Sequence, residues 1–244
     1  MPVSQRRQGS SLHPAAYAAL TAYAAYDSRV TKNSILFVTT AATNMDPTGK
    51  RILKRITDKG RSYVFTRKDF QDLAPTGSTG KILSRLVEAG LIRRLGRGLF
   101  DYPRINQALG GELSPDIEKV AQSVARKFGW TIMPEGALAA NQLGLSQQVP
   151  AKIVYLSDGP SKKVQAGNSV IHFKHARPKE LRAENYASGL VIQALRHLGK
   201  DNVERKVIDL LRKRLSSKER TNLLNDTRYG TDWIYQVAQR ITEA

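Results

Sequence analysis

Basic and hydroxyl side chains gather in one stretch of the sequence, between Ser78 and Arg97. Helical spacing places Ser78, Lys81 and Arg85 on one side of a predicted helix, away from its apolar side. A guanidinium group such as that of Arg85 can bond a guanine edge at two points, and hydroxyl groups near a helix N-terminus suit phosphate. The pattern therefore predicts contacts with the bases and phosphates of DNA. The predicted contact residues are Ser78, Thr79, Lys81, Ser84, Arg85, Arg93, Arg94 and Arg97.

The elements that must position these side chains surround them in the sequence. Apolar spacing predicts a helix that Thr66 can cap, with Phe70 and Leu73 on its apolar side, and a second helix over 78–89. Strands beginning at 91–92 and returning over 99–102 flank the tight reversal Gly96-Arg97-Gly98 and form a hairpin. Helix, turn, helix and basic hairpin in this order are typical of a winged helix-turn-helix. In that fold the second helix enters the major groove and the hairpin touches an adjacent groove or the phosphates.

The distribution of charge along the chain indicates a polyanion site in the same region. The 244 residues carry 39 Lys and Arg against 21 Asp and Glu, a formal net charge of +18 at pH 7. A field of this sign attracts polyanions. Residues 48–104 hold 14 Lys and Arg and 5 Asp and Glu, a net charge of +9. Half of the excess charge thus lies in less than a quarter of the chain, which favours one localised polyanion site over a uniformly basic surface.

The remaining periodicity predicts three parts and an α+β fold class. Residues 1–46 are predicted to be an N-terminal extension, part of which we expect to be disordered. Residues 47–104, which include a first helix over 48–59, form the winged helix-turn-helix DNA-binding domain. A glycine-containing linker at 106–112 leads to a C-terminal α+β domain over 113–244. That domain is predicted to have a helix that starts at Ser114-Pro115-Asp116, a helix over 135–143, a helical block from 178 onward, and a small sheet with strands at 130–132, 151–156, 162–165 and 169–175.

Enzyme chemistry has few candidate residues. The chain contains no cysteine, and His172 and His175 lie three apart on a predicted strand, where alternation points them to opposite faces. One alternative is a metal-dependent nuclease, in which Asp158 on one strand and a lysine, Lys174, on the next would flank Mg²⁺. That site would hold only one acid, because His172 stands where a second carboxylate is required. We therefore expect no enzymatic activity, no cofactor and no metal.

The sequence also predicts a cytoplasmic protein with no membrane partner. No run approaches the 18 or more apolar residues of a membrane helix. The absence of cysteine agrees with a reducing compartment, where disulfides are rare. Arg6-Arg7 precedes an Ala- and Tyr-rich stretch, but His13 and Pro14 interrupt the apolar core that a signal peptide needs.

Four segments, taken in order, resemble the AbiEi-like antitoxins of bacterial type IV toxin–antitoxin systems, which act in abortive infection and phage defence. The segments are GLIRRLGRGLFDYP (90–103), GELSPDIEKVAQSVARKFG (111–129), PAKIVYLSDGPSKKV (150–164) and GLVIQALRHLGKD (189–201). The resemblance covers residues 46–243 and leaves out the first 45. It implies an N-terminal winged helix joined to a C-terminal antitoxin domain.

This resemblance implies a transcriptional repressor that binds inverted repeats in its own promoter and counters a nucleotidyltransferase-like toxin. DNA contact would fall on Ser78, Thr79, Lys81, Arg85 and the hairpin arginines. The antitoxin role would fall on the C-terminal domain, where the loop 158–163 and the basic helix around 205–214 are candidates. The alternatives are an interaction module that binds an acidic protein partner without DNA, and the metal-dependent nuclease.

Overall fold

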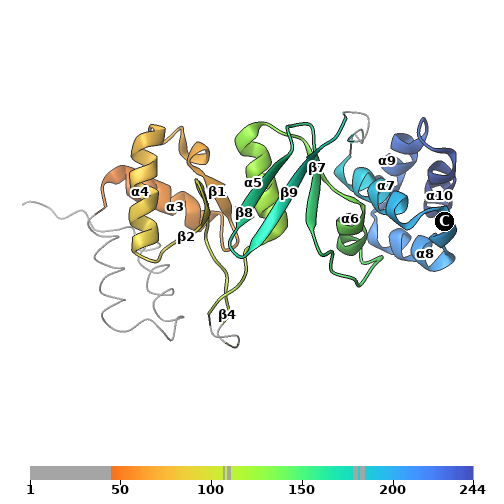
Figure 1. The fold of residues 1–244 in the computed structure, drawn as a ribbon, viewed down its shortest axis with the longest axis horizontal. Coiled ribbons are helices and arrows are strands. Elements are labelled where there is room, and N and C mark those ends of the chain that lie inside the picture. The colour runs from red at the N-terminus through yellow and green to blue at the C-terminus, as the bar shows by residue number, and fades with distance from the viewer. Residues whose placement is uncertain (1–44, 107, 109–110, 178–180, 182–184, 244) are drawn as a thin grey trace, which may run out of the picture. The chain divides into compact units, whose positions relative to one another are not determined.

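The computed structural model describes residues 45–243, except 107, 109–110, 178–180 and 182–184 (Figure 1). The predicted N-terminal extension therefore lies almost entirely outside the described residues. The chain divides into two compact units, Met1–Val120 and Ala121–Ala244, and the division falls within a helix, α5 (Ile117–Phe128). None of the described helices is long and apolar enough to cross a membrane.

From residue 45 to residue 101, the described part of the first unit contains two helices, a short 3₁₀ helix and a three-stranded antiparallel sheet. Its elements in chain order are α3 (Pro47–Asp58), β1 (Val64–Thr66), η1 (Arg67–Phe70), α4 (Thr76–Glu88), β2 (Arg93–Gly96) and β3 (Leu99–Asp101). The strand order is β1-β3-β2, so that the hairpin strand β3 lies in the middle. The predicted helices and hairpin are present, with ends displaced by a few residues.

Local signals account for the ends of these elements. The Asp46 carboxylate caps α3 by accepting a hydrogen bond from the main-chain N–H of Gly49, and Pro47 occupies the first turn. Thr66 and Asp69 form a capping box, but the helix they begin is the four-residue η1 and no longer helix follows. Gly90 adopts a left-handed conformation (φ 68°) just after α4, where a helix commonly ends.

One apolar core joins these elements. It includes Ile52 and Ile56 from α3, and Leu83 and Leu86 from α4, all of which are fully buried. Three phenylalanines complete it: the Phe65 ring meets Phe70 edge-on at 5.5 Å and stacks on Phe100 at 6.1 Å, between ring centroids. Because α4 and the hairpin pack on the same apolar core, their relative position is fixed.

The segment predicted to be a linker contains structure. Strands β4 (Ile105–Asn106) and β5 (Gly111–Glu112) pair antiparallel, with Ile105 opposite Glu112. The glycine content suggested a linker, but the segment folds back on itself. The main-chain N–H of Leu113 donates to the carbonyl oxygen of Arg104 and extends this pairing.

The second unit contains a mixed four-stranded sheet, and a block of helices follows it in the sequence. The sheet has the order β6-β7-β9-β8; β7 is parallel to β9, and the two outer pairs are antiparallel. The predicted hairpin about Gly167 is confirmed, with Lys163 opposite His172. The elements are β6 (Ile132–Pro134), α6 (Gly136–Gln142), β7 (Ile153–Ser157), β8 (Lys162–Ala166), β9 (Ser169–His175), α7 (Tyr186–Leu198), η3 (Lys200–Asn202), α8 (Arg205–Arg214), α9 (Ser217–Thr227) and α10 (Asp232–Thr242).

The helical block has its own core, centred on the apolar side of α7. Val191 and Leu195 of α7 are fully buried among Leu211 of α8, Leu223 of α9 and Ile241 of α10. Together the two units give a mixed α+β fold, as predicted, with eight α-helices and three small sheets among the described residues.

Candidate functional site

A groove of about 560 Å³ lies between α4 and the β2–β3 hairpin. We call it the helix–hairpin groove; its charged lining residues are Arg67, Lys81, Arg85, Glu88, Arg94 and Arg97. Five cations therefore surround one carboxylate. Helical spacing explains how α4 supplies Lys81, Arg85 and Glu88, because these residues recur every three or four positions opposite the buried stripe that contains Ile82, Leu83 and Leu86.

Several cations of this groove are not neutralised by the protein itself. The side chains of Arg67, Lys81, Arg85 and Arg97 make no hydrogen bond or ion pair within the described residues. All four residues are exposed. Arg97 lies at the hairpin turn, beside Gly98, whose φ of 69° suits a tight reversal. Such a concave, unpaired cluster of positive charge raises the local concentration of anions.

Arg67 is a lining residue that the sequence analysis missed. It belongs to η1, and a Cβ atom at Gly80 would lie 3.3 Å from its Cδ and Nη1 atoms. The glycine thus lets the Arg67 side chain lie close against α4. The sequence contains no local signal for this contact, because it depends on how η1 packs against α4.

Ser84 and Arg94 connect the two walls of the groove. Nη2 of Arg94 on β2 donates a hydrogen bond of 3.2 Å to Oγ of Ser84 on α4. The Arg94 guanidinium also lies 5.1 Å from the centre of the Phe100 ring, a distance typical of a cation–π contact. Arg94 is therefore held in place, whereas Arg97 at the hairpin tip is not.

Thr79 does not line the groove, although it is one of the predicted contact residues. Its side chain is buried, and Oγ1 donates to the carbonyl oxygens of Ala74 (3.3 Å) and Pro75 (3.1 Å). Thr79 precedes Ile82 and Leu83 by three and four residues, which puts it on the core side of α4. Ser78 is exposed but is not among the residues lining the groove.

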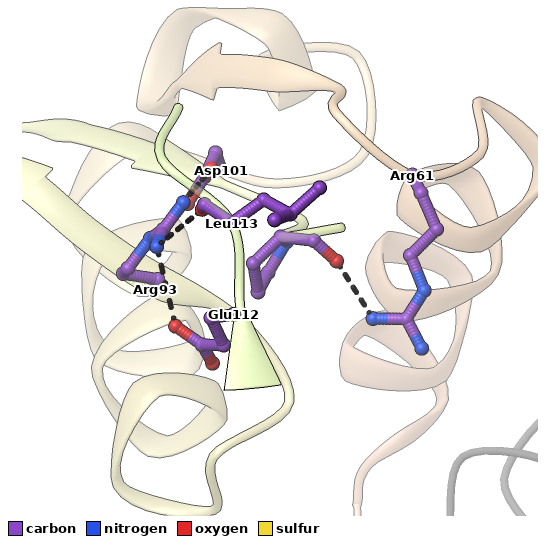
Figure 2. A network of polar contacts seen from close by, with 6 residues as sticks. Arg61, Arg93, Asp101, Glu112 and Leu113 are labelled. Atoms are coloured by element: carbon purple, nitrogen blue, oxygen red, sulfur yellow. Dashed lines mark hydrogen bonds and ion pairs between the residues drawn. The ribbon is translucent and has the colours of Figure 1, made fainter. Parts of the chain in front are cut away.

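Arg93, another predicted contact residue, is engaged inside the protein (Figure 2). Its Nε and Nη2 atoms donate to the two carboxylate oxygens of Asp101 at 3.0 and 2.7 Å. Its Nη1 atom donates to Oε2 of Glu112 at 3.3 Å and to the carbonyl oxygen of Leu113 at 3.0 Å. The carboxylate hydrogen bonds of Asp101 raise the pKa of Arg93 above its ordinary value. Arg93 therefore fastens the base of the hairpin to β5, where the structure leaves it little to offer a ligand.

In the structure, Asp158 and Lys174, the residues of the nuclease alternative, each interact with another partner. Oδ1 of Asp158 accepts a hydrogen bond of 2.9 Å from the main-chain N–H of Thr131, while Nζ of Lys174 pairs with Oε1 of Glu135 at 3.0 Å. The acid beside the lysine is thus Glu135, which lies 39 positions away and which sequence spacing could not identify. In the part of the chain that the structure describes, no cluster of three His, Asp or Glu residues could hold a metal ion.

Comparison with known proteins places the chain among proteins of unknown function. A family model, described as a family of unknown function (DUF6088), matches residues 51–223. The solved structure of the RV2827C protein from Mycobacterium tuberculosis is similar to this chain, with 15% sequence identity and a TM-score of 0.37 over 82% of this chain and 77% of that one. The comparison with curated proteins gives no match.

Proposed function

The chain belongs to DUF6088, a family of unknown function, and we propose that it is a DNA-binding transcriptional repressor whose first unit is a winged helix-turn-helix. The observation that carries this proposal is the helix–hairpin groove, in which Arg67, Lys81, Arg85 and Arg97 are exposed and unpaired within the described residues. A helix flanked by a basic hairpin has the width and the charge to enter the major groove of a duplex.

Each side chain of the groove has its own role in this proposal. Arg85, in the last turn of α4, bonds a guanine edge, and Lys81 and Ser84 contact neighbouring bases or phosphates. Arg97 at the hairpin tip, with Arg67, contacts phosphates, and Ser78 near the start of α4 adds a hydroxyl donor for another phosphate. Arg94 keeps the hairpin at a fixed distance from α4 through Ser84. Thr79 and Arg93 stabilise the fold and do not contact DNA in this proposal.

The biological setting that we propose rests on the resemblance to AbiEi-like antitoxins. The chain would bind inverted repeats in its own promoter, repress its operon in the cytoplasm, and counter a nucleotidyltransferase-like toxin of an abortive infection system. The second unit would carry the antitoxin role. This unit contains the PAKIVYLSDGPSKKV and GLVIQALRHLGKD segments that support the resemblance.

The proposal is tested by titrating the full chain with its own upstream DNA at several salt concentrations. Arg97→Ala should weaken binding to every sequence and lower the slope of log K against log salt by about one, because one phosphate contact is lost. Arg85→Ala should instead relax the preference at one or two base pairs, at a cost of about 1–3 kcal/mol in discrimination. Lys119→Ala, which removes an exposed cation of α5 outside the groove, is the matched control.

Three outcomes would change the interpretation of the groove. If affinity depends on neither salt nor sequence, DNA recognition is wrong and an acidic protein partner becomes the better explanation of the groove. If Arg85→Ala and Arg97→Ala have identical effects, the division between base and phosphate contacts is wrong. Mg²⁺-dependent cleavage of DNA by the purified chain would favour the nuclease alternative.

A further inference from the structure

The second unit contains a cavity of about 690 Å³ that DNA recognition by α4 and the hairpin does not use. We call it the sheet–helix cavity, because β7, β9 and α7 line it together with the residue that precedes α6. Its lining residues are Glu135, Leu156, Lys174, His175, Arg177, Gln193 and Arg196. The volume lies within the range of about 300–1,000 Å³ that is usual for small-molecule sites.

The charge of this cavity favours an anion. Lys174, Arg177 and Arg196 contribute three cations, and Glu135 is the single carboxylate. The Glu135 carboxylate pairs with Lys174 at 3.0 Å, and the cations that line the cavity outnumber the carboxylates by two. Guanidinium groups present several N–H donors in one plane, a geometry that matches phosphate better than a spherical anion.

The wall of the cavity also contains a buried amide. The Gln193 side chain is only 7% exposed. Its neighbours along α7, Ile192 and Ala194, belong to the apolar core. Leu156, which is 8% exposed, supplies an apolar surface beside this amide. The cavity thus combines cations, an amide and an apolar surface, as sites for small polar ligands do.

The imidazole ring of His175 is held in a defined orientation. Its Nδ1 atom lies 3.0 Å from the carbonyl oxygen of Gly159, and its main-chain N–H donates to Oγ of Ser161 at 3.0 Å. A carbonyl oxygen only accepts hydrogen bonds, so we assign the proton of the neutral ring to Nδ1, which leaves Nε2 as an acceptor. The loop 158–161 therefore positions one more polar group at the cavity.

From these observations we propose that the sheet–helix cavity binds a phosphate monoester that also carries hydroxyl groups, as nucleotides do. The phosphate contacts Arg177 and Arg196. Glu135 and Nε2 of His175 accept hydrogen bonds from hydroxyl or amino groups of the ligand, and the apolar part lies against Leu156. The same chemistry is offered by a free nucleotide and by the 5′-phosphate end of a single-stranded nucleic acid.

Calorimetric titration of the full chain separates this site from the DNA groove. The titrations use a chain that carries Arg85→Ala and Arg97→Ala, so that phosphate binding in the helix–hairpin groove is suppressed. The probes are inorganic phosphate, a nucleoside 5′-monophosphate, and an oligonucleotide with either a 5′-phosphate or a 5′-hydroxyl end. Binding of the monophosphate or of the 5′-phosphorylated oligonucleotide is expected, and identifies the source of the ligand.

Variants of the cavity residues test whether the ligand is an anion. Arg196→Ala should weaken binding about tenfold or more, as expected for the loss of a charged hydrogen bond. Glu135→Gln should strengthen it, because a negative charge is removed while an acceptor remains. Lys213→Ala, an exposed cation of α8 outside the cavity, should change nothing. The circular dichroism spectrum of each variant verifies that it is folded.

The proposal is overturned if none of the phosphate probes binds at millimolar concentration. It is also overturned if Arg196→Ala behaves as Lys213→Ala does, or if Glu135→Gln weakens binding, which would indicate a cationic ligand. None of these three results bears on the proposed DNA binding, because that function depends on residues of the first unit.

Discussion

Replacing Arg93 by methionine should destabilise the first unit by about 3 kcal/mol, because it leaves the Asp101 carboxylate buried without its partner. The Asp101 side chain is 2% exposed and that of Arg93 is 24% exposed. Loss of one partner of a fully buried ion pair costs about 3–5 kcal/mol, and the partial exposure of Arg93 places this pair at the lower end. Methionine keeps most of the aliphatic volume, so that lost packing adds little.

The two units can be followed separately in this experiment. Both tryptophans, Trp130 and Trp233, belong to the second unit, so tryptophan fluorescence reports on that unit alone. Urea unfolding of Arg93→Met should therefore move the transition seen by circular dichroism that belongs to the first unit, and leave the fluorescence transition where it is. Hydrogen exchange of the β3 amides should accelerate in parallel.

A double-mutant cycle isolates the ion pair. Asp101→Asn alone should cost about 2 kcal/mol, and the double variant Arg93→Met/Asp101→Asn should cost about 2 kcal/mol less than the sum of the two. The stabilising role of Arg93 at the base of the hairpin is refuted if the coupling energy is absent. It is also refuted if Arg93→Met lowers the free energy of unfolding no more than Lys119→Ala does. DNA titration adds an independent readout: the salt slope of folded Arg93→Met should equal that of the wild type, in contrast to Arg97→Ala.

Two further predictions concern buried and capping hydroxyl groups. Thr79→Val should lower the free energy of unfolding of the first unit by about 1 kcal/mol, because the hydroxyl hydrogen bonds to two carbonyl oxygens are lost, and DNA affinity measured by titration should not change; a clear loss of affinity would return Thr79 to the interface. In the second unit, hydrogen bonds from Ser216 lower the pKa of Glu219, so the stability they contribute is present above the ordinary pKa and is lost as the pH falls through the lower folded value. Glu219→Gln should therefore reduce the stability of the second unit at pH 7 and remove this loss at acid pH, as followed by tryptophan fluorescence; acid sensitivity equal to that of the wild type would contradict the linkage.

Sequence patterns predicted best the helices and hairpins whose positions depend on residues close together in the chain. The spacing of Ile82, Leu83 and Leu86 located α4, and the turn about Gly167 located the β8–β9 hairpin, because each pattern reflects local geometry. The same helical spacing contained the information that Thr79 is buried, since it lies three residues before Ile82. Because Thr79 carries a hydroxyl group near a helix N-terminus, we expected a phosphate contact, whereas the structure buries this side chain.

Contacts between distant segments could not be read from the sequence. The pairing of Arg93 with Asp101 follows from the register of the hairpin, but its contacts with Glu112 and Leu113 depend on the β4–β5 pair, which the sequence indicated only as a linker. Glu135 and Lys174 meet across 39 positions. Such contacts depend on how the chain folds back on itself, and no short pattern encodes them.

The hydrogen-bonding state of an arginine is the physical property that separates its structural from its functional role in this unit. Arg93 is buried in part, and Asp101 fixes it through two hydrogen bonds. Arg85 and Arg97 carry the same guanidinium group, but they are exposed and unpaired within the described residues, in a groove where like charges repel one another. That repulsion destabilises the folded unit until an anion neutralises it, so the same charges that disfavour the free protein strengthen binding to a polyanion. Charge alone does not distinguish these two roles, and the hydrogen bonds and ion pairs of each arginine decide which of the predicted contact residues we propose for DNA.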